Sequence, residues 1–121
     1  MILDDLITIL SGICKTVIEQ GSLADDEPYP AERFFTFWND STDDHKHYDN
    51  DTYGYTWLVD VNFYSTDPDD VYTTLDAARL ALKQSGWVIN GKGHTIGSDD
   101  KRYSGRGFTA AYLEIEETKR R

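Results

Sequence analysis

Segment 53–87 constrains the fold more than any other part of the chain. In its first half apolar and aromatic residues occupy every second position, and Thr56, Asp60 and Asn62 lie between them. The alternating apolar positions are Tyr55, Trp57, Val59, Val61 and Phe63. A period of two is typical of a β-strand that buries one face in a core and leaves the other face largely polar.

A helix is predicted directly after this strand. Residues 65–70 contain an N-cap candidate, a proline suited to a first helical turn, and acids that favour the positive end of a helix dipole. Apolar residues then recur at helical spacing, at Val71, Leu75, Ala78 and Leu82. Gly86 is expected to end the helix, and a third strand to begin at Trp87.

The rest of the chain completes an α+β pattern. Residues 2–20 have the apolar spacing of an amphipathic helix that ends at Gly21. Residues 31–38 carry aromatics on both faces of a strand, which predicts a central or doubly covered position. Residues 39–52 read as a long polar loop between two antiparallel strands. Glycines at 91 and 93 break the third strand, and residues 108–115 form the last.

We therefore predict one α+β domain over residues 1–121, in the order α-β-β-α-β-β. Its sheet should have four mainly antiparallel strands with the helices packed on one face. The core should span about residues 2–116, followed by a charged tail at 117–121. Core packing is the expectation for the three tryptophans, Trp38, Trp57 and Trp87.

Charge is unevenly distributed along the chain, whose formal net charge is −10. Residues 22–70 hold thirteen of the 22 acidic residues and two of the 12 basic ones, whereas residues 71–121 hold six acidic and nine basic residues. The middle of the chain should therefore repel nucleic acid. Such a surface can simply be solvated, line a passage for DNA, or mimic DNA.

Little in the sequence indicates catalysis. The single cysteine, Cys14, excludes an internal disulfide and is expected as a small buried residue in the first helix. His45 and His47 lie in a polar segment without an evident third ligand. Residues 91–94 lack the spacing of a phosphate loop. We expect no enzyme activity, no cofactor, no metal site, no membrane span, and a cytosolic chain whose first residues lack the basic start of a signal peptide.

Several segments together are similar to a known family. They are Glu27–Pro30 followed by the aromatic run Phe34–Trp38, the strand Tyr55–Ser65 with Asp67 and Pro68 after it, and the helix end Leu82–Trp87. In this order they resemble the tail terminator proteins, also called tail-completion or head–tail joining proteins, of long-tailed bacteriophages or prophages. The resemblance covers roughly residues 25–116 and rests on structural motifs, since the family has no catalytic residues.

The resemblance implies a structural role late in virion assembly. Such proteins form a ring, commonly a hexamer, at the head-proximal end of the tail tube. The ring ends tube polymerisation and docks to the head connector protein, and DNA passes through it without specific binding. The expected partners are therefore other copies of the chain, the tail tube protein and the head connector, and the expected location is the virion, with the host cytoplasm during assembly.

Two groups of residues follow as candidate sites. Three bases, Lys101, Arg102 and Arg106, are expected to face a neighbouring subunit. Five acids in the polar segment, Asp40, Asp43, Asp44, Asp49 and Asp51, are expected to face the lumen or the tube. The alternatives are another head–tail connector component, an acidic DNA mimic that inhibits a DNA-processing enzyme, and a small enzyme or ligand-binding domain.

Overall fold

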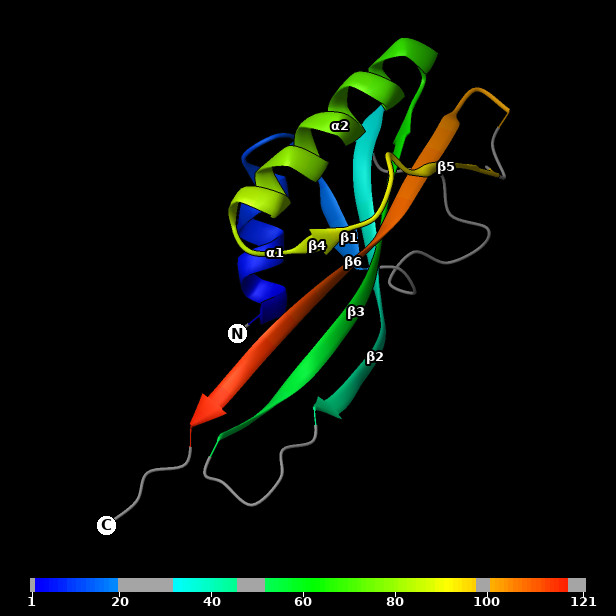
Figure 1. Cartoon of the computed structure of the whole chain (residues 1–121). Coiled ribbons are helices and arrows are strands. Elements are labelled where there is room, and N and C mark those ends of the chain that lie inside the picture. Colours follow the sequence, from blue (N-terminus) through cyan, green and yellow to red (C-terminus); the bar gives the residue numbers. More distant parts are fainter. Residues whose placement is uncertain (1, 20–31, 46–51, 98–100, 118–121) are drawn as a thin grey trace.

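A computed structural model describes residues 2–19, 32–45, 52–97 and 101–117 (Figure 1). Two helices and six strands follow one another along the chain: α1 (Ile2–Ser11), β1 (Val17–Glu19), β2 (Arg33–His45), β3 (Thr52–Ser65), α2 (Pro68–Gln84), β4 (Val88–Ile89), β5 (His94–Ile96) and β6 (Ser104–Glu117). The strands form one sheet in the order β1-β2-β3-β6-β4, and β5 also pairs with β6. All pairs are antiparallel except β1 with β2.

The α+β prediction is confirmed, with six strands in place of four. One extra strand comes from the break at residues 91–93, where Gly91 and Gly93 have φ of +74° and +100°. These angles are easy for glycine alone, so the chain turns between β4 and β5. The other extra strand, β1, lies in a segment that we had predicted to be helical.

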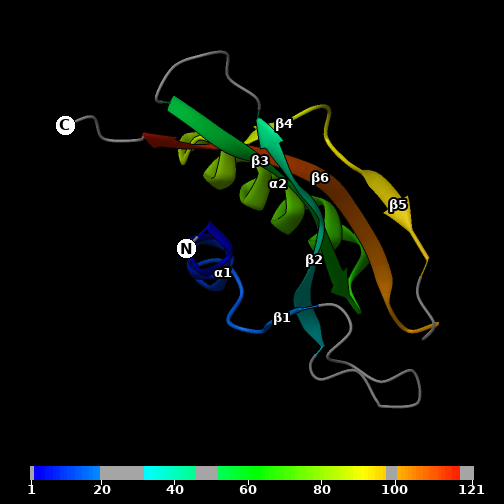
Figure 2. The same ribbon diagram turned by 90° about the horizontal axis from the view of Figure 1, so that it is seen from below.

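Both helices pack on the same face of the sheet, which we call the helix face. Figures 1 and 2 show α1 beside β1 and α2 along β3 and β6. Alternate sheet residues and one stripe of each helix form a single apolar core: Leu6, Leu10, Phe35, Phe37, Val59, Val61, Phe63, Val71, Leu75, Ala78, Leu82, Phe108 and Ala110. Burial of each large side chain in this set stabilises the fold by about 1.5–3 kcal/mol. Because Val59, Val61 and Phe63 of β3 all belong to this core, the predicted strand with one buried face is confirmed.

The ends of α2 also follow the sequence. Asp67 is the N-cap, and its carboxylate accepts a hydrogen bond of 3.0 Å from the backbone N–H of Asp69. Pro68 occupies the first helical position, where a missing N–H costs nothing. After the helix, Gly86 has φ of +99° and redirects the chain into Trp87.

The first helix is shorter than predicted. It ends at Ser11, and Val17 lies in a strand, because the β-branched residues at 16–18 pair with β2. The pairing begins with a 2.9 Å hydrogen bond from the N–H of Phe35 to the carbonyl of Thr16. Cys14 therefore sits in the connection after α1 but is buried, as expected. Gly21 lies outside the described residues.

The segment predicted as a polar loop is mostly strand. β2 continues to His45 and β3 starts at Thr52, with antiparallel pairing up to the pair His45 and Gly54. An irregularity at residues 39–41 shifts the register, and such bulges let a strand continue with a stronger twist. The antiparallel pairing of the two strands was predicted correctly, but the length of the loop between them was overestimated.

The prediction that the three tryptophans pack in the core is wrong only for Trp38. Trp87 is buried and Trp57 packs partly against the core. Trp38 lies on the opposite face of the sheet, which carries no helix in the described residues, and is 46% exposed. Phe34, on that same outer face, is buried, with its ring stacked on Tyr64 at 5.2 Å. On this outer face of β2, the aromatic residue near the start of the strand is therefore buried, and the one further along is exposed.

A polar cluster ties the start of β2 to α2. The Arg33 guanidinium donates hydrogen bonds of 2.9 and 3.0 Å to the Asp70 carboxylate and one of 2.9 Å to the Thr74 hydroxyl. These bonds from Arg33 hold the pKa of Asp70 below its ordinary value, against the opposing effect of burial, and the Thr74 and Ser65 hydroxyls add to the lowering.

This cluster predicts a loss of stability in acid. Because the pKa of Asp70 is lower in the folded than in the unfolded chain, its stabilisation is complete above the unfolded pKa of about 4. It is lost as the pH falls through the folded pKa. We expect Asp70→Asn to cost roughly 1 kcal/mol at pH 7, since Arg33 is 43% exposed and solvent screens the pair. Urea unfolding between pH 3 and 7 should show a shallower acid slope for this variant; an unchanged slope would contradict the assignment.

Candidate assembly surfaces

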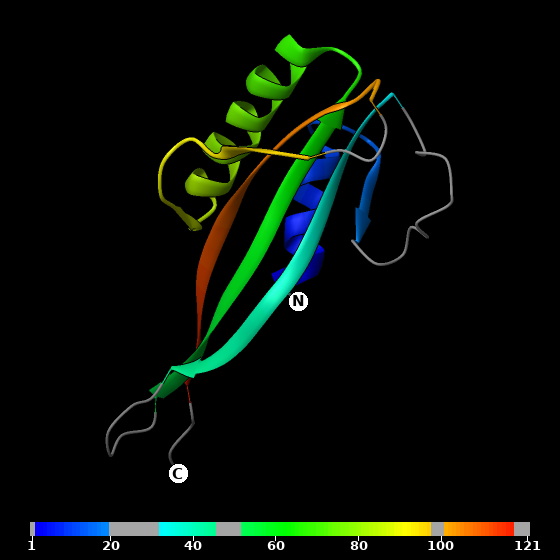
Figure 3. The ribbon, with the colours of Figure 1, turned by 90° about the vertical axis from the view of Figure 1, so that its right-hand side faces the viewer.

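The sheet extends well beyond the helices at one end. Figure 3 shows β2, β3 and β6 running together past α1 toward the lower end of the view. We define the acidic arm as residues 39–45, 52–58 and 111–117, which pair across these three strands apart from the irregularity at residue 40. The arm has no Lys or Arg and carries six acids: Asp40, Asp43, Asp44, Glu114, Glu116 and Glu117.

Three of the five acids predicted to form one group lie on a strand of the arm and not in a loop. Asp40, Asp43 and Asp44 lie on β2, and the register places Asp44 opposite Tyr55, which in turn pairs with Glu114. Acids from two outer strands are therefore brought to the same end of the sheet. Asp49 and Asp51 lie outside the described residues. The three glutamates were missed as part of this group because they are some seventy residues away in sequence.

The three predicted bases lie at the opposite end of β6. We call Lys101, Arg102 and Arg106 the basic corner. Lys101 and Arg102 are exposed in the turn before β6, at the upper right in Figure 1. The Arg102 guanidinium is 5.8 Å from the centre of the Tyr103 ring, which makes an edge contact with buried Phe34. Since β6 has 14 residues, the corner and the arm tip are separated by roughly 45 Å.

Arg106 is held within its own chain by hydrogen bonds and a ring contact. Its guanidinium donates a 3.0 Å hydrogen bond to the carbonyl of Gly93 and lies 4.8 Å from the centre of the Tyr72 ring. It also donates a 3.5 Å bond to the Thr95 hydroxyl. Arg106 therefore connects β6 to the β4–β5 turn and to α2, in addition to any contact with a neighbour.

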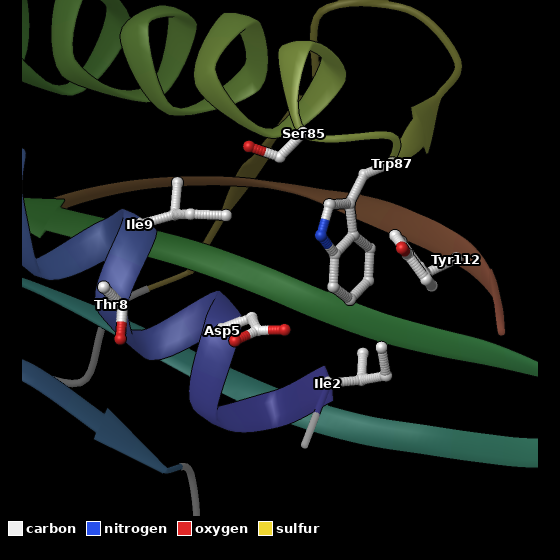
Figure 4. Close-up of a pocket in the computed structure, with 7 residues that line it drawn as sticks. All are labelled: Ile2, Asp5, Thr8, Ile9, Ser85, Trp87 and Tyr112. Atoms are coloured by element: carbon white, nitrogen blue, oxygen red, sulfur yellow. The ribbon is translucent and has the colours of Figure 1, made fainter.

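A pocket of about 280 Å³ opens between α1 and the C-terminal end of α2 (Figure 4). We call it the α1 pocket. Its lining comes from three parts of the chain: Ile2, Asp5, Thr8 and Ile9 on α1, Ser85 and Trp87 after α2, and Tyr112 on β6. The Trp87 and Tyr112 rings are 5.1 Å apart and tilted by 54°. Figure 4 shows the Asp5 carboxylate and these two rings around one space.

No local sequence pattern predicts this pocket. Asp5 read as an acid in the first turn of a helix, Trp87 as a core residue and Tyr112 as one position of a strand. Only the turn at Gly86 and the pairing of β4 with β6 bring Trp87 over Tyr112. Helix α1 then has to dock beside them before Asp5 can reach the same space.

The described residues form neither a metal-binding cluster nor a membrane-spanning helix. Within residues 2–19, 32–45, 52–97 and 101–117, no group of three or more His, Cys, Asp or Glu residues is placed to hold a metal ion. Over the same part of the chain, neither helix has the length and apolar character needed to cross a membrane.

Comparisons with known proteins yield likenesses of structure but none of sequence. No protein-family model matches the chain, and no curated protein matches its sequence. A chain from the virion of a native gene transfer agent particle has a similar structure, with 10% sequence identity and a TM-score of 0.49. The match covers 88% of this chain and 84% of that chain. A likeness at this level carries no inference about function.

Proposed function

We propose that this protein is a virion structural protein of a long-tailed phage or prophage and acts as a tail terminator. Copies of it form a ring, most simply a hexamer, at the head-proximal end of the tail tube. The ring ends tube polymerisation and joins the tail to the head connector. It acts without catalysis, cofactor or membrane contact, assembles in the host cytoplasm and remains in the virion.

One observation supports this proposal beyond the family resemblance: opposite charges lie at the two ends of one strand. β6 begins at the basic corner and ends in the acidic arm. A closed ring requires heterologous contacts, in which two different surfaces of each copy complement each other. A chain that is basic at one end and acidic at the other has two such different surfaces, and repulsion between the acidic arms of neighbouring copies favours docking through the basic corner.

Within the ring, we assign the basic corner to the contact between neighbours. The acids at positions 40, 43, 44, 49 and 51 face the lumen or the tube. A lumen lined with carboxylates repels the phosphate backbone, so DNA passes without adhering.

The first test is the mass of the purified protein in solution. Light scattering over a concentration series should give a species of about six subunits, and negative-stain images of that species should show closed rings. The association should weaken with added salt, because its contacts are between exposed charges. A strict monomer at every concentration, which also fails to bind the end of purified tail tubes, would contradict the proposal.

The acidic arm also favours a second candidate, a DNA mimic that inhibits a DNA-processing enzyme. Its six acids are carried by paired strands at one end of the sheet, and negative charge concentrated in this way can compete with the phosphate backbone of DNA for a basic surface. Under this alternative the protein stays monomeric and binds a DNA-processing enzyme in competition with duplex DNA. A ring that binds no such enzyme would exclude it.

A further inference from the structure

The α1 pocket has the chemistry of a site for a cationic side chain. A carboxylate from Asp5 and the rings of Trp87 and Tyr112 border the same space. Ammonium and guanidinium groups are attracted both to carboxylates and to the faces of aromatic rings. An anion would be repelled by Asp5, and a purely apolar group would leave that carboxylate without a partner.

The size of the pocket fits one side chain. Its volume of about 280 Å³ lies just below the range for pockets that hold whole small-molecule ligands, which is about 300–1,000 Å³. Ile2 and Ile9 provide apolar wall beside Asp5. The aliphatic stem of a Lys or Arg side chain packs on such a wall while its charged end reaches a carboxylate.

Asp5 is also available for a partner. Three other acids of the described residues are engaged: Asp70 binds Arg33, Asp76 binds Arg79 at 2.8 Å, and Asp60 accepts a hydrogen bond from the Thr109 hydroxyl. Asp5 is exposed and has no hydrogen bond or ion pair with any other part of the chain that the structure describes. No Lys or Arg lines the pocket.

We propose that the α1 pocket of one copy receives a basic side chain, Lys101 or Arg102, from the basic corner of a second copy. This inference rests on the proposed ring and names the surface that the basic corner meets. Charge complementarity supports it, because the corner is exposed and cationic and the pocket is open and anionic. The two surfaces lie at different ends of the molecule (Figure 1), so the contact is heterologous and can close into a ring.

The experiment uses a charge swap with a matched control. Asp5→Lys places a base in the pocket, and Asp4→Lys makes the same charge change one residue away, on a side chain that does not line the pocket. Association is followed by light scattering over a dilution series, and circular dichroism checks that each variant is folded. We expect Asp5→Lys to weaken association at least about 30-fold, the effect of disrupting one partner of an interfacial charge pair, and Asp4→Lys to change it by less than about threefold.

A mixing experiment then identifies the partner surface. Asp5→Lys protein and Lys101→Glu/Arg102→Glu protein should each associate poorly alone, and mixing them should restore part of the association, because the reversed charges match again. Wild-type association by the Asp5→Lys variant, an equal loss with Asp4→Lys, or no recovery in the mixture would overturn this contact and leave the ring itself standing. A wild-type protein that never associates, either in solution or at the end of purified tail tubes, would overturn both.

Discussion

Replacing Lys101 and Arg102 together with glutamate is expected to abolish ring formation. Both side chains are exposed in the turn before β6, so the substitutions reverse two charges without disturbing the core. Each neighbour would then present like charge to an acidic surface, and like-charge juxtaposition costs several kcal/mol at an interface. Light scattering of the double variant should show a monomer at concentrations where the wild type forms rings.

The design leaves out Arg106, the third base of the basic corner. Its hydrogen bond to the Gly93 carbonyl and its contact with the Tyr72 ring hold the β4–β5 turn and α2 in place. A substitution there would change the fold and the interface together. Lys15→Glu/Lys83→Glu is the better control, since it makes the same change in net charge at two exposed positions outside the corner and the α1 pocket. Rings of normal size from the Lys101/Arg102 variant would refute the assignment of the corner.

Local signals were sufficient where sequence and structure agree. The strand, cap and helix of segment 53–84 follow from apolar spacing, from Asp67 and Pro68, and from the glycine at 86, all of which act within a few residues. Where the structure differs from the sequence prediction, tertiary contacts determined the secondary structure. Residues 17–19 became a strand because β2 offered an edge to pair with.

The acidic arm was missed for a different reason. Apolar alternation marks a strand only where one of its faces is buried. The part of β2 at residues 39–45 runs past the helices (Figure 3), so polar residues are tolerated along it and these residues look like loop in the sequence. Their strand structure depends on backbone pairing with β3, which residue type alone does not reveal.

The candidate site was predictable only in part. A charge count along the chain leads to Lys101 and Arg102, which are exposed, but it places the three glutamates of the acidic arm in the basic part of the chain. It does not reveal that Arg106 is used internally, nor that Glu114 joins Asp44 across β3. The α1 pocket is still harder to predict from the sequence, because it forms only when α1, β4 and β6 pack together.

Phe63→Ala is expected to cause the largest loss of stability of any substitution considered for this chain. The Phe63 side chain is fully buried, its ring lies 4.8 Å from that of Phe35, and the Arg33 guanidinium covers it at 5.4 Å. Truncation of a buried phenylalanine costs about 3–5 kcal/mol, from lost burial and the cavity left behind. Because a domain of this size is stable by about 5–15 kcal/mol, the variant should unfold at a much lower urea concentration.

Trp38→Ala is the matched control on the other face of the sheet. Trp38 is as large a residue on an adjoining strand, but 46% of it is already in contact with water. Its truncation should therefore cost less than about 1.5 kcal/mol at protein concentrations where the chain is monomeric. A loss as large as that of Phe63→Ala would contradict the exposed position of Trp38. A loss that appears only where rings form would instead place this tryptophan in a contact between copies.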